Sequence, residues 1–485
     1  MSSYDTHALH KIMHPKSIAF WGASNNSMAM GSVQLSNLLL MNFEGPVYPI
    51  HPKHQMIQGL QAYSRVSEVP GPVDLAVLVL PTHVVPEVLE DCGKFGIDRA
   101  IIVSAGFGEQ DGAHGKELQQ QIVDIANKYS IRFVGPNCIG VVNPSHRLNT
   151  TFFPYEATPG FIGMASQSGS FITQMFVHLA KFGLGYSEGF SLGNEAMTDL
   201  TDCIEYLAES PETRVIALYI EGIRRGRDFV RVASRVSRKK PIVAFYIGGS
   251  ESGGRAGMSH TGAMAGPDAL YDGIFKQSGI IRARSIEELF DFCYVLGSQP
   301  LPKGDNVAIL THSGGPGAAA ADAAERGGLK LASFSSETLT KLQALVPGTA
   351  SVKNPVDLTF SKNYSDYMAS MPEILLSDSN VDSLFIYCLM PHQRVIQAVV
   401  GAGIGKDQAG SFANQYITTQ SAIASQFAAK FGKPVVGGTY CDRSELFVRE
   451  LQDNGMPVLA SPERAVTAMG ALAKYAEWRR NHEAD

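Results

Sequence analysis

Short apolar runs rich in β-branched residues recur along the whole chain, and segments long enough for a helix separate them. Most of these runs end in Gly, Pro, Ser or Asn, which interrupt regular structure. Such alternation of strand-like and helix-like segments predicts parallel sheets wrapped by helices. In residues 1–145 it predicts a nucleotide-binding domain of the Rossmann type. The runs there are SIAFWGAS, VYPIHP, DLAVLVLP, RAIIVSAGF and IRFVGPNCIGVVNP.

Two further series of strands and helices follow, over residues 146–297 and 298–485, with the linker-like stretch SQPLPKGDN at their border. Both series open alike. GFIGMASQSGSFITQMF and NVAILTHSGGPGAAAAD each run from an apolar strand through a Ser-Gly turn into a helix. This likeness predicts two flavodoxin-like domains, each with a helix N-terminus at the carboxyl edge of its sheet. A length of 485 residues is consistent with three domains.

Composition narrows the class of protein. Hydrophobic residues make up 45% of the chain and charged residues 18%, which is typical of a globular protein. The net charge is −6, and no cluster of Lys and Arg with aromatic residues is present, so no nucleic-acid partner is expected. No signal peptide or long apolar stretch is found, which favours a cytoplasmic protein away from membranes. The six cysteines stand singly, so we expect reduced thiols and no tightly bound metal in this chain.

The loop GASNNSMAMG (22–31) follows the first predicted strand. Its small residues let backbone N–H groups approach a phosphate, and the next helix adds its positive end. Because the loop is not a GxGxxG motif, it predicts only a nucleotide or phosphate site, and an ordinary tight turn is the alternative. Lys53, in HPKH after the second strand, is either a phosphate ligand or a solvated surface lysine.

The two Ser-Gly turns are SQSGS (166–170) and HSGGPG (312–317). Each leaves unpaired N–H groups at a helix start, to which Ser168, Ser170 or Ser313 can add a hydroxyl donor. Two such turns that face one point would hold a dianion. The alternative interpretation is a pair of ordinary helix N-caps.

His260 lies in SHTGAMAG (259–266), after about twelve residues rich in Gly and Ser. Its imidazole could act as a nucleophile towards a phosphate held by the helix ends, although a lone His is more often a core or surface residue. Glu221 ends the strand VIALYIEG, where α/β sheets place functional residues. A carboxylate there could fix the tautomer of the imidazole, and a strand-end surface Glu is the alternative.

The order of these motifs along the chain is the GAS loop, HPK, GPNC, SQSG, the strand-end Glu, SHTGA and SGG. In this order the sequence resembles the NDP-forming acyl-CoA synthetase superfamily, which includes ADP-forming acetyl-CoA synthetases and the succinyl-CoA synthetase α-subunit. The resemblance covers nearly the whole chain. SHTGAMAG and GPNCIGVVNP carry it most specifically, and the GAS loop less so.

The resemblance implies the CoA-binding, phosphohistidine-bearing α-subunit of an acid–thiol ligase. Such an enzyme interconverts an acyl-CoA, phosphate and ADP with a small carboxylic acid, CoA and ATP. Phosphate attacks the acyl-CoA carbonyl to give an acyl phosphate, a histidine takes the phosphoryl group, and the phosphohistidine transfers it to ADP. Oriented N–H groups suit this task because they offset the charge of the phosphoryl group without reorganising.

The resemblance also assigns roles to individual residues. His260 would be phosphorylated, and Glu221 would orient it. The phosphate-binding residues would be Ser168, Gly169, Ser170, Ser313, Gly314 and Gly315. The CoA-binding residues would be Gly22, Ala23, Ser24, Lys53, Ser104, Ala105 and Gly106. The acid-binding residues would be Asn137, Asn354 and Asp357, the last two from KNPVDLT (353–359).

The chain departs from the family pattern in two places. The usual stretch, roughly KPIVALKAGR, reads KPIVAFYIGG here, with Tyr246 and Gly249 at the positions of the basic residues. Phosphate affinity or loop contacts are therefore expected to differ. The chain also stops after the third domain, without an ATP-grasp pair. This implies a separate ATP-grasp β-subunit that holds ATP or ADP with Mg, in an α2β2-type hetero-oligomer.

Two other functions remain open from the sequence. The first is a CoA-sensing or regulatory protein that keeps the fold without catalysis, a reading that the changed basic residues support. The second is an NAD-dependent dehydrogenase, which has only the Rossmann-like start in its favour. The chain lacks GxGxxG and has HPK where a dehydrogenase has its ribose-binding acid.

Overall fold

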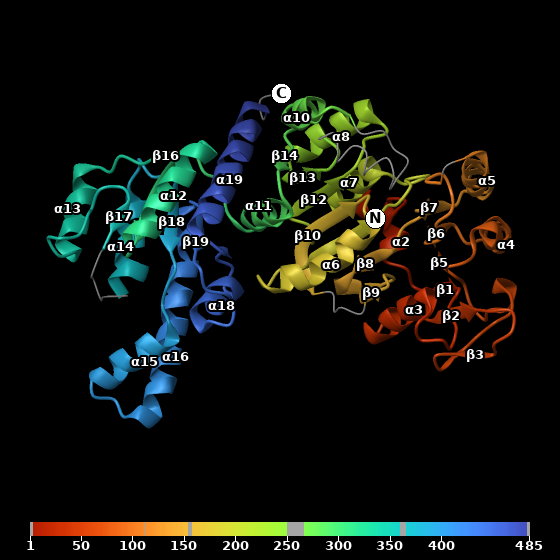
Figure 1. Ribbon diagram of the computed structural model, residues 1–485, viewed down its shortest axis with the longest axis horizontal. Coiled ribbons are helices and arrows are strands. Elements are labelled where there is room, and N and C mark those ends of the chain that lie inside the picture. Colours follow the sequence, from red (N-terminus) through yellow and green to blue (C-terminus); the bar gives the residue numbers. More distant parts are fainter. Residues whose placement is uncertain (1–2, 111, 154–157, 250–265, 359–364, 483–485) are drawn as a thin grey trace. The chain divides into compact units, whose positions relative to one another are not determined.

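The computed structural model describes residues 3–482 except 111, 154–157, 250–265 and 359–364. The chain divides into two compact units. The first consists of Met1–Ala180 and Leu184–Arg284, and the second of Lys181–Gly183 and Ser285–Asp485. Each unit is built from largely parallel sheets with helices on their faces (Figure 1), which confirms the predicted α/β class. The three-domain division of the sequence stays a prediction.

The first sheet of the first unit has five parallel strands in the order β2-β1-β5-β6-β7. The order reverses between β1 and β5, and doubly wound sheets bind ligands at the carboxyl ends of the strands at such a point. The strands are β1 (Ile18–Trp21), β2 (Val47–Ile50), β5 (Leu75–Leu78), β6 (Arg99–Ile102) and β7 (Arg132–Val134). The helices are α3 (Met30–Leu40), α4 (Val85–Phe95) and α5 (Ala113–Tyr129).

The second sheet of this unit has seven strands in the order β14-β13-β12-β10-β11-β8-β9. Five are parallel: β10 (Pro159–Ser166), β11 (Tyr186–Ser191), β12 (Val215–Ile220), β13 (Ile242–Tyr246) and β14 (Ile281–Ala283). β8 (Val141–Asn143) and β9 (Leu148–Asn149) form an antiparallel edge. The helices are α6 (Gly169–Ala180), α7 (Leu200–Glu209), α8 (Gly226–Ser237) and α10 (Asp268–Ser278).

The run IRFVGPNCIGVVNP is divided between the two sheets. Its first part forms β7, and its last part forms β8, which pairs with β11 of the second sheet. Between them the chain turns at Gly135 and Asn137, whose φ values are 101° and 58°. Residues with such φ values end a strand, so one apolar run in the sequence becomes two strands in different sheets.

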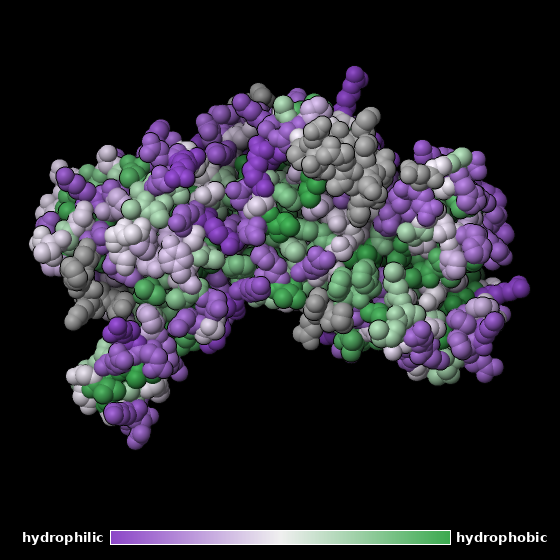
Figure 2. Space-filling model, in the orientation of Figure 1, coloured by the Kyte–Doolittle hydropathy of each residue, from purple (hydrophilic) through white to green (hydrophobic). Residues whose placement is uncertain are grey.

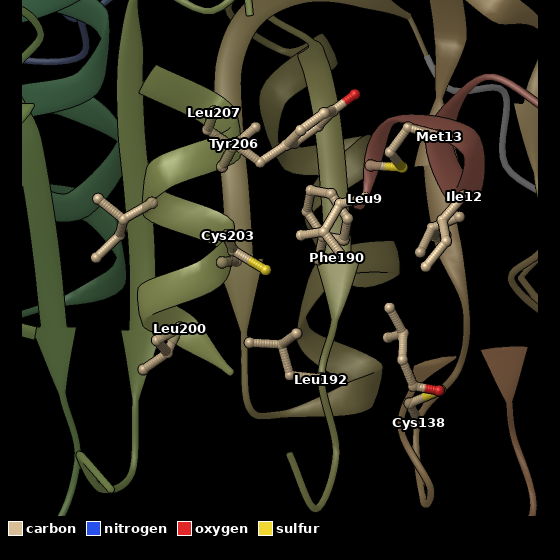
Figure 3. Packing of buried hydrophobic residues seen from close by; sticks show 14 of the residues in the cluster. Leu9, Ile12, Met13, Cys138, Phe190, Leu192, Leu200, Cys203, Tyr206 and Leu207 are labelled. Carbon is tan, nitrogen blue, oxygen red and sulfur yellow. The ribbon is translucent and has the colours of Figure 1, made fainter. Parts of the chain in front are cut away.

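A shared apolar core joins the two sheets of the first unit. Leu9, Ile12 and Met13, in and beside helix α2 (His10–Met13), lie against Phe190 of β11 and Tyr206 of α7 (Figure 3). Each of these side chains is fully buried. Burial of one large apolar side chain stabilises a fold by about 1.5–3 kcal/mol, so this core fixes the two sheets relative to each other.

The second unit contains a parallel sheet in the order β16-β15-β18-β19-β20, with β17 paired to β15. The strands are β15 (Asn306–Thr311), β16 (Lys330–Leu331), β17 (Val356–Asp357), β18 (Ser383–Tyr387), β19 (Val435–Gly438) and β20 (Val458–Leu459). The main helices are α11 (Ile286–Ser298), α12 (Gly314–Gly327), α13 (Ser336–Leu345), α14 (Met371–Ser377), α15 (His392–Gly401), α16 (Lys406–Ser425), α18 (Leu446–Asp453) and α19 (Pro462–His482). Helix α19 packs against both α11 and α12 (Figure 1).

The surface shown in Figure 2 is largely hydrophilic, with smaller apolar areas between the charged side chains. Among the helices in the described part of the chain, none combines the length and the hydropathy that a membrane span requires.

Candidate functional site

A cavity of about 760 Å³ opens at the carboxyl ends of β1, β2 and β5. Gly22, Ala23 and Ser24 line it, together with residues of α4 on the opposite side. The position is the switch point of the first sheet, where a nucleotide-type ligand is expected. The cations Arg65 and Lys94 also line the cavity and can neutralise phosphate groups.

Two glycines shape the entrance loop of this cavity. Gly22 has a φ of 89°, and a Cβ there would overlap the carbonyl oxygen of Val79. A Cβ on Gly31, at the start of α3, would overlap the carbonyl of Gly22. The loop therefore lies against both the sheet and the helix start. Lys53 follows the lining residues His51 and Pro52 but is not itself part of the lining.

A second cavity, of about 480 Å³, lies between the two sheets of the first unit. Leu80 lines both cavities, so they adjoin. Three motifs meet in the second one, namely the end of β6, the loop after β7 and the Ser-Gly turn before α6. They contribute the predicted site residues Ser104, Ala105, Asn137, Gly169 and Ser170. Gly106 is not among its lining residues.

The rest of the second cavity is formed mainly by apolar side chains. Met30, Val79, Leu80, Val103 and Phe152 line it, and its described lining includes no charged residue. An uncharged acyl group fits this apolar lining. The acyl group of a dicarboxylic acid would carry a free carboxylate, which would lose its hydration here without a cation to pair with. The N-terminal end of α6 supplies a local positive potential through the helix dipole.

Gln167 sits in the Ser-Gly turn and contacts the strand end that carries Glu221. The N–H groups of Glu221 and Gly222 donate to Gln167 Oε1, at 2.6 and 3.0 Å. Gln167 Nε2 donates to the Gly222 carbonyl at 2.7 Å. The turn and the end of β12 are therefore tied together. Glu221 directly follows β12 and is 6% exposed, while His260 lies outside the described residues.

Ser168 and Ser166 complete this turn. The hydroxyl of Ser166 donates to the carbonyl of Ser168 at 2.8 Å, which directs the chain into α6. Ser168 is also hydrogen-bonded to Tyr219, whose pKa burial raises to about 12.

Tyr246 and Gly249, which stand where the resemblance places basic residues, have structural contacts. The Tyr246 hydroxyl donates to the carbonyl of Gly266 at 2.8 Å. Its ring stacks on Tyr271, with the ring centroids 3.5 Å apart. A Cβ on Gly249 would overlap the carboxylate of Asp268, which pairs with Arg282. Burial raises the pKa of Tyr246 to about 12, so its hydroxyl stays protonated as a donor.

The second Ser-Gly turn lies in the second unit, at the start of α12. Ser313 precedes the helix, and its hydroxyl is 3.1 Å from His312 Nδ1. An Asp357 carboxylate oxygen lies 3.4 Å from the position of a Cβ on Gly314. Ser313, Gly314 and Asp357 are therefore close together, and Gly315 follows them in the first turn of α12. The prediction that the two Ser-Gly turns face one point stays a prediction.

The side chain of Asn354 is hydrogen-bonded to three backbone groups. Its Oδ1 accepts from the N–H of Ile309 at 3.0 Å, and its Nδ2 donates to the carbonyls of Val307 and Ala332. These bonds hold the segment before β17 against β15. The predicted role of Asn354 in binding the acid remains untested.

Sequence reasoning missed several residues of the site. Gln167 lines the second cavity, Asn194 and Glu195 are buried behind its lining, and Arg65 and Lys94 line the first cavity. Asn194 and Glu195 follow the strand run YSEGFSLGN, so their position after a strand was a usable signal. Arg65 and Lys94 stand in no motif, and only the fold brings them to the cavity.

Two family models match the chain. The model described as a CoA binding domain matches residues 16–144. The model described as a succinyl-CoA ligase like flavodoxin domain matches residues 159–296. Together these matches cover both sheets of the first unit except the edge strand β9.

Similar proteins cover almost the full chain. The alpha subunit of acetate–CoA ligase [ADP-forming] II from Pyrococcus furiosus is 38% identical, over 97% of this chain and 98% of its own length. Acetate–CoA ligase [ADP-forming] I from Archaeoglobus fulgidus is 37% identical over 97% of this chain, which spans 64% of that protein. The dinucleotide-forming acetyl-coenzyme A synthetase 1 of Ca. Korarchaeum cryptofilum, solved with phosphate and ADP, matches with a TM-score of 0.85, 34% identity and 98% coverage of each chain.

Proposed function

The chain belongs to the NDP-forming acyl-CoA synthetase superfamily, and we propose from this that it is the CoA-binding, phosphohistidine-bearing α-subunit of an ADP-forming acyl-CoA synthetase. The proposal depends on one observation above all. The cavity of about 480 Å³ is lined both by strand ends of the CoA-binding domain and by the Ser-Gly turn of the ligase-like domain. An acyl thioester and a phosphate would meet there.

Binding of CoA would use the larger cavity. Its place at the switch point fits the nucleotide part of CoA, and Arg65 and Lys94 would pair with phosphate groups. From there the pantetheine arm would pass Leu80 into the smaller cavity, where Ser104, Ala105 and Asn137 lie. The uncharged lining supports a small monocarboxylic acid as the acyl group.

The first chemical step is attack by phosphate on the thioester carbonyl. The N–H groups of Gly169 and Ser170, at the start of α6, hold the phosphate and offset its charge. An oxygen of the phosphate forms a bond to the carbonyl carbon, and the C–S bond breaks. The products are an acyl phosphate and the CoA thiolate, which takes up a proton as CoA leaves.

His260 then attacks the phosphorus of the acyl phosphate. A P–N bond forms, the P–O bond to the acyl group breaks, and the free acid departs as its carboxylate. Glu221 fixes the imidazole tautomer that carries the lone pair. The phosphoryl group passes from His260 to ADP on a partner subunit.

The partner in this proposal is an ATP-grasp β-subunit that holds ADP or ATP with Mg, in an α2β2-type assembly. Support comes from the Pyrococcus furiosus relative, which is named as an alpha subunit and has nearly the length of this chain. The longer Archaeoglobus fulgidus relative extends well beyond the matched part. The names of both relatives support ADP as the nucleotide.

The test uses the first two steps, which need no nucleotide. The chain is incubated with radiolabelled phosphate and either acetyl-CoA or butyryl-CoA, with succinyl-CoA for comparison. We expect release of CoA together with an acid-labile, base-stable label on the protein. His260→Ala should abolish the label, and His114→Ala, an exposed histidine of α5, should leave it unchanged.

The result also separates the alternative functions. Binding of CoA by calorimetry with no label from any of the acyl-CoAs would contradict the proposal and favour a CoA-sensing protein. Undiminished labelling of His260→Ala would refute the assignment of the phosphorylated residue.

A further inference from the structure

Residues 192–198 form a loop that lies between the two sheets of the first unit. The loop follows β11, and its backbone is bonded to both neighbouring motifs. The N–H of Leu192 donates to the carbonyl of Ser166, at the start of the Ser-Gly turn, at 2.9 Å. The N–H of Asn194 donates to the carbonyl of Pro136, in the GPNC motif, at 2.9 Å. The loop is therefore fixed to both sides of the smaller cavity.

Asn194 directs its side chain towards the CoA-binding domain and is 2% exposed. Its Nδ2 donates to Glu109 Oε2 at 2.5 Å, and its Oδ1 accepts from Asn137 Nδ2 at 3.2 Å. The other carboxylate oxygen of Glu109 accepts from the N–H groups of Gly106 and Phe107. Asn194 thus supports two motifs beside the cavity, VSAGF and GPNC.

Glu195, the next residue, contacts the ligase-like domain instead. Its Oε2 accepts from Gln167 Nε2 at 2.8 Å, and its Oε1 accepts from the N–H of Leu200 at 2.9 Å. Gln167 in turn binds the N–H groups of Glu221 and Gly222, so its amide is fully hydrogen-bonded. Glu195 therefore supports the strand end that carries Glu221.

Both contacts pair an amide with a carboxylate, and in the contact between Gln167 and Glu195 both side chains are buried. Gln167 and Glu195 are 6% and 7% exposed, and burial raises the pKa of Glu195 to about 8. A carboxylate at position 167 would face the buried Glu195, whose Oε2 also lies 3.5 Å from Arg224 Nε and whose pKa the charge of Asp199 raises. The two carboxylates at positions 167 and 195 would then share a proton, which couples the geometry of that pair to pH. A carboxylate at position 194 would face Glu109, which is half-buried.

We propose that Asn194 and Glu195 are positioning residues. They would hold the residues that receive the thioester and the residues that orient the phosphoryl-transfer step at fixed positions relative to each other. Asn194 sets the strand ends that receive the thioester, through Glu109 and Asn137. Glu195 sets the end of β12, and so Glu221, through Gln167. Neither side chain lines the cavity, so both act through other residues. The inference rests on the proposed acyl-CoA synthetase function.

A matched pair of isosteric variants tests the two roles separately. Asn194→Asp places a carboxylate against Glu109. Gln167→Glu places one against Glu195 and also at the wall of the cavity that Gln167 lines. The readouts, with acetyl-CoA and labelled phosphate at about pH 8, are the KM for acetyl-CoA and the maximal rate of His260 labelling. Misplacement of a reacting group costs about tenfold to a hundredfold in rate, so the effects are measurable.

Asn194→Asp is expected to raise the KM for acetyl-CoA by about tenfold or more, with a smaller change in maximal labelling rate. Gln167→Glu should show the reverse, a labelling rate lowered by about tenfold or more with a nearly unchanged KM. Equal effects of both variants on both parameters would overturn the division of roles.

Second substitutions distinguish positioning from general loss of structure. Glu195→Gln in the Gln167→Glu background, and Glu109→Gln in the Asn194→Asp background, reverse each amide–carboxylate pair. The double variant at positions 109 and 194 should recover part of the KM for acetyl-CoA, and the one at positions 167 and 195 part of the maximal labelling rate. Gln167→Glu alone should recover part of its labelling rate as the pH is lowered to about 6. Absence of both recoveries in folded protein would overturn the inference. A wild-type chain that is never labelled would instead refute the proposed function.

Discussion

At the scale of single residues, the site depends on a few positions where backbone comes very close to backbone. Gly22 is the clearest example, because its φ of 89° and its contact with the Val79 carbonyl both exclude a side chain. The sequence singles out Gly22 through its place in the GAS loop. The sequence does not show that Gly22 is constrained by packing against the backbone next to β5 in addition to the close approach of a phosphate.

Gly22→Ala is therefore expected to weaken CoA binding strongly. Gly59→Ala is a matched control, because Gly59 also has a positive φ, of 82°, but nothing within 4 Å of a Cβ. Both variants lose about 1–2 kcal/mol of stability from the backbone conformation alone. Only Gly22→Ala adds the clash, so calorimetry should show a large loss of CoA affinity for that variant. Equal affinities of the two variants would contradict this account.

The hydroxyl of Tyr246 gives a second prediction for a single residue. Tyr246→Phe removes the bond to the Gly266 carbonyl but keeps the ring on Tyr271, and should cost about 1 kcal/mol in the free energy of unfolding. Tyr246→Lys restores the residue type that is usual in the family and should cost more, because it also removes the stacked ring. Urea unfolding measures both. Tyr440→Phe, at an exposed tyrosine, is the control, and a Lys variant as stable as wild type would be evidence against this explanation.

At the scale of elements, the strand runs and Ser-Gly turns of the sequence correspond closely to the strands and helix starts of the structure. SQSGS leads into α6, HSGGPG leads into α12, and Glu221 follows β12. Sequence periodicity could not show that VVN of the GPNC run leaves the first sheet and pairs with β11. That pairing depends on contacts between segments far apart in the chain, which local patterns do not encode.

The short N-terminal helices were also not predicted. Helix α2 packs its apolar side chains into the shared core, and His14, directly after it, is partly buried beside His10 and His146. Burial is the largest cause of a lowered pKa for His14, about 4, and the two other histidines lower it further. A hydrogen bond with the backbone of His10 and the charge of Asp5 act in the opposite direction.

This arrangement predicts acid sensitivity of the first unit. His14 is neutral in the folded state, so its contribution to stability is present above about pH 6.5 and is lost as the pH falls towards 4. Glu188, whose pKa burial raises, works in the opposite direction at low pH. His14→Gln should therefore show a flatter fall of the unfolding free energy between these pH values. His114→Gln, at an exposed site, should follow wild type, and parallel curves for all three proteins would contradict the prediction.

At the scale of the whole molecule, the first unit contains the cavity proposed to bind CoA and one Ser-Gly turn, while the second turn belongs to the second unit. The α/β class and the family follow from motif order in the sequence. The meeting of VSAGF, GPNC and SQSG around one cavity does not, because only the packing of the two sheets determines it. Gln167, Asn194 and Glu195 were missed for the same reason.

This organisation predicts a single turnover by the isolated chain. Under the proposed function, a phosphoryl group on His260 would have no acceptor without a partner subunit, so CoA release should stop after about one equivalent per chain. Addition of ADP alone should not change the yield, whereas ADP with an ATP-grasp partner should restart release. A thiol assay measures the burst, and continued release from the isolated chain would show that this subunit turns over alone.

The most direct test of the central claim is an experimental structure of the chain with CoA and phosphate bound. The account predicts the thiol sulfur in the cavity of about 480 Å³, beside Ser104 and Ala105, and the phosphate on the N–H groups of Gly169 and Ser170. The two groups should lie close enough for a thioester carbonyl between them to be attacked, about 3–3.5 Å from the phosphate oxygen. A thiol outside this cavity, or a phosphate bound away from the start of α6, would contradict the account.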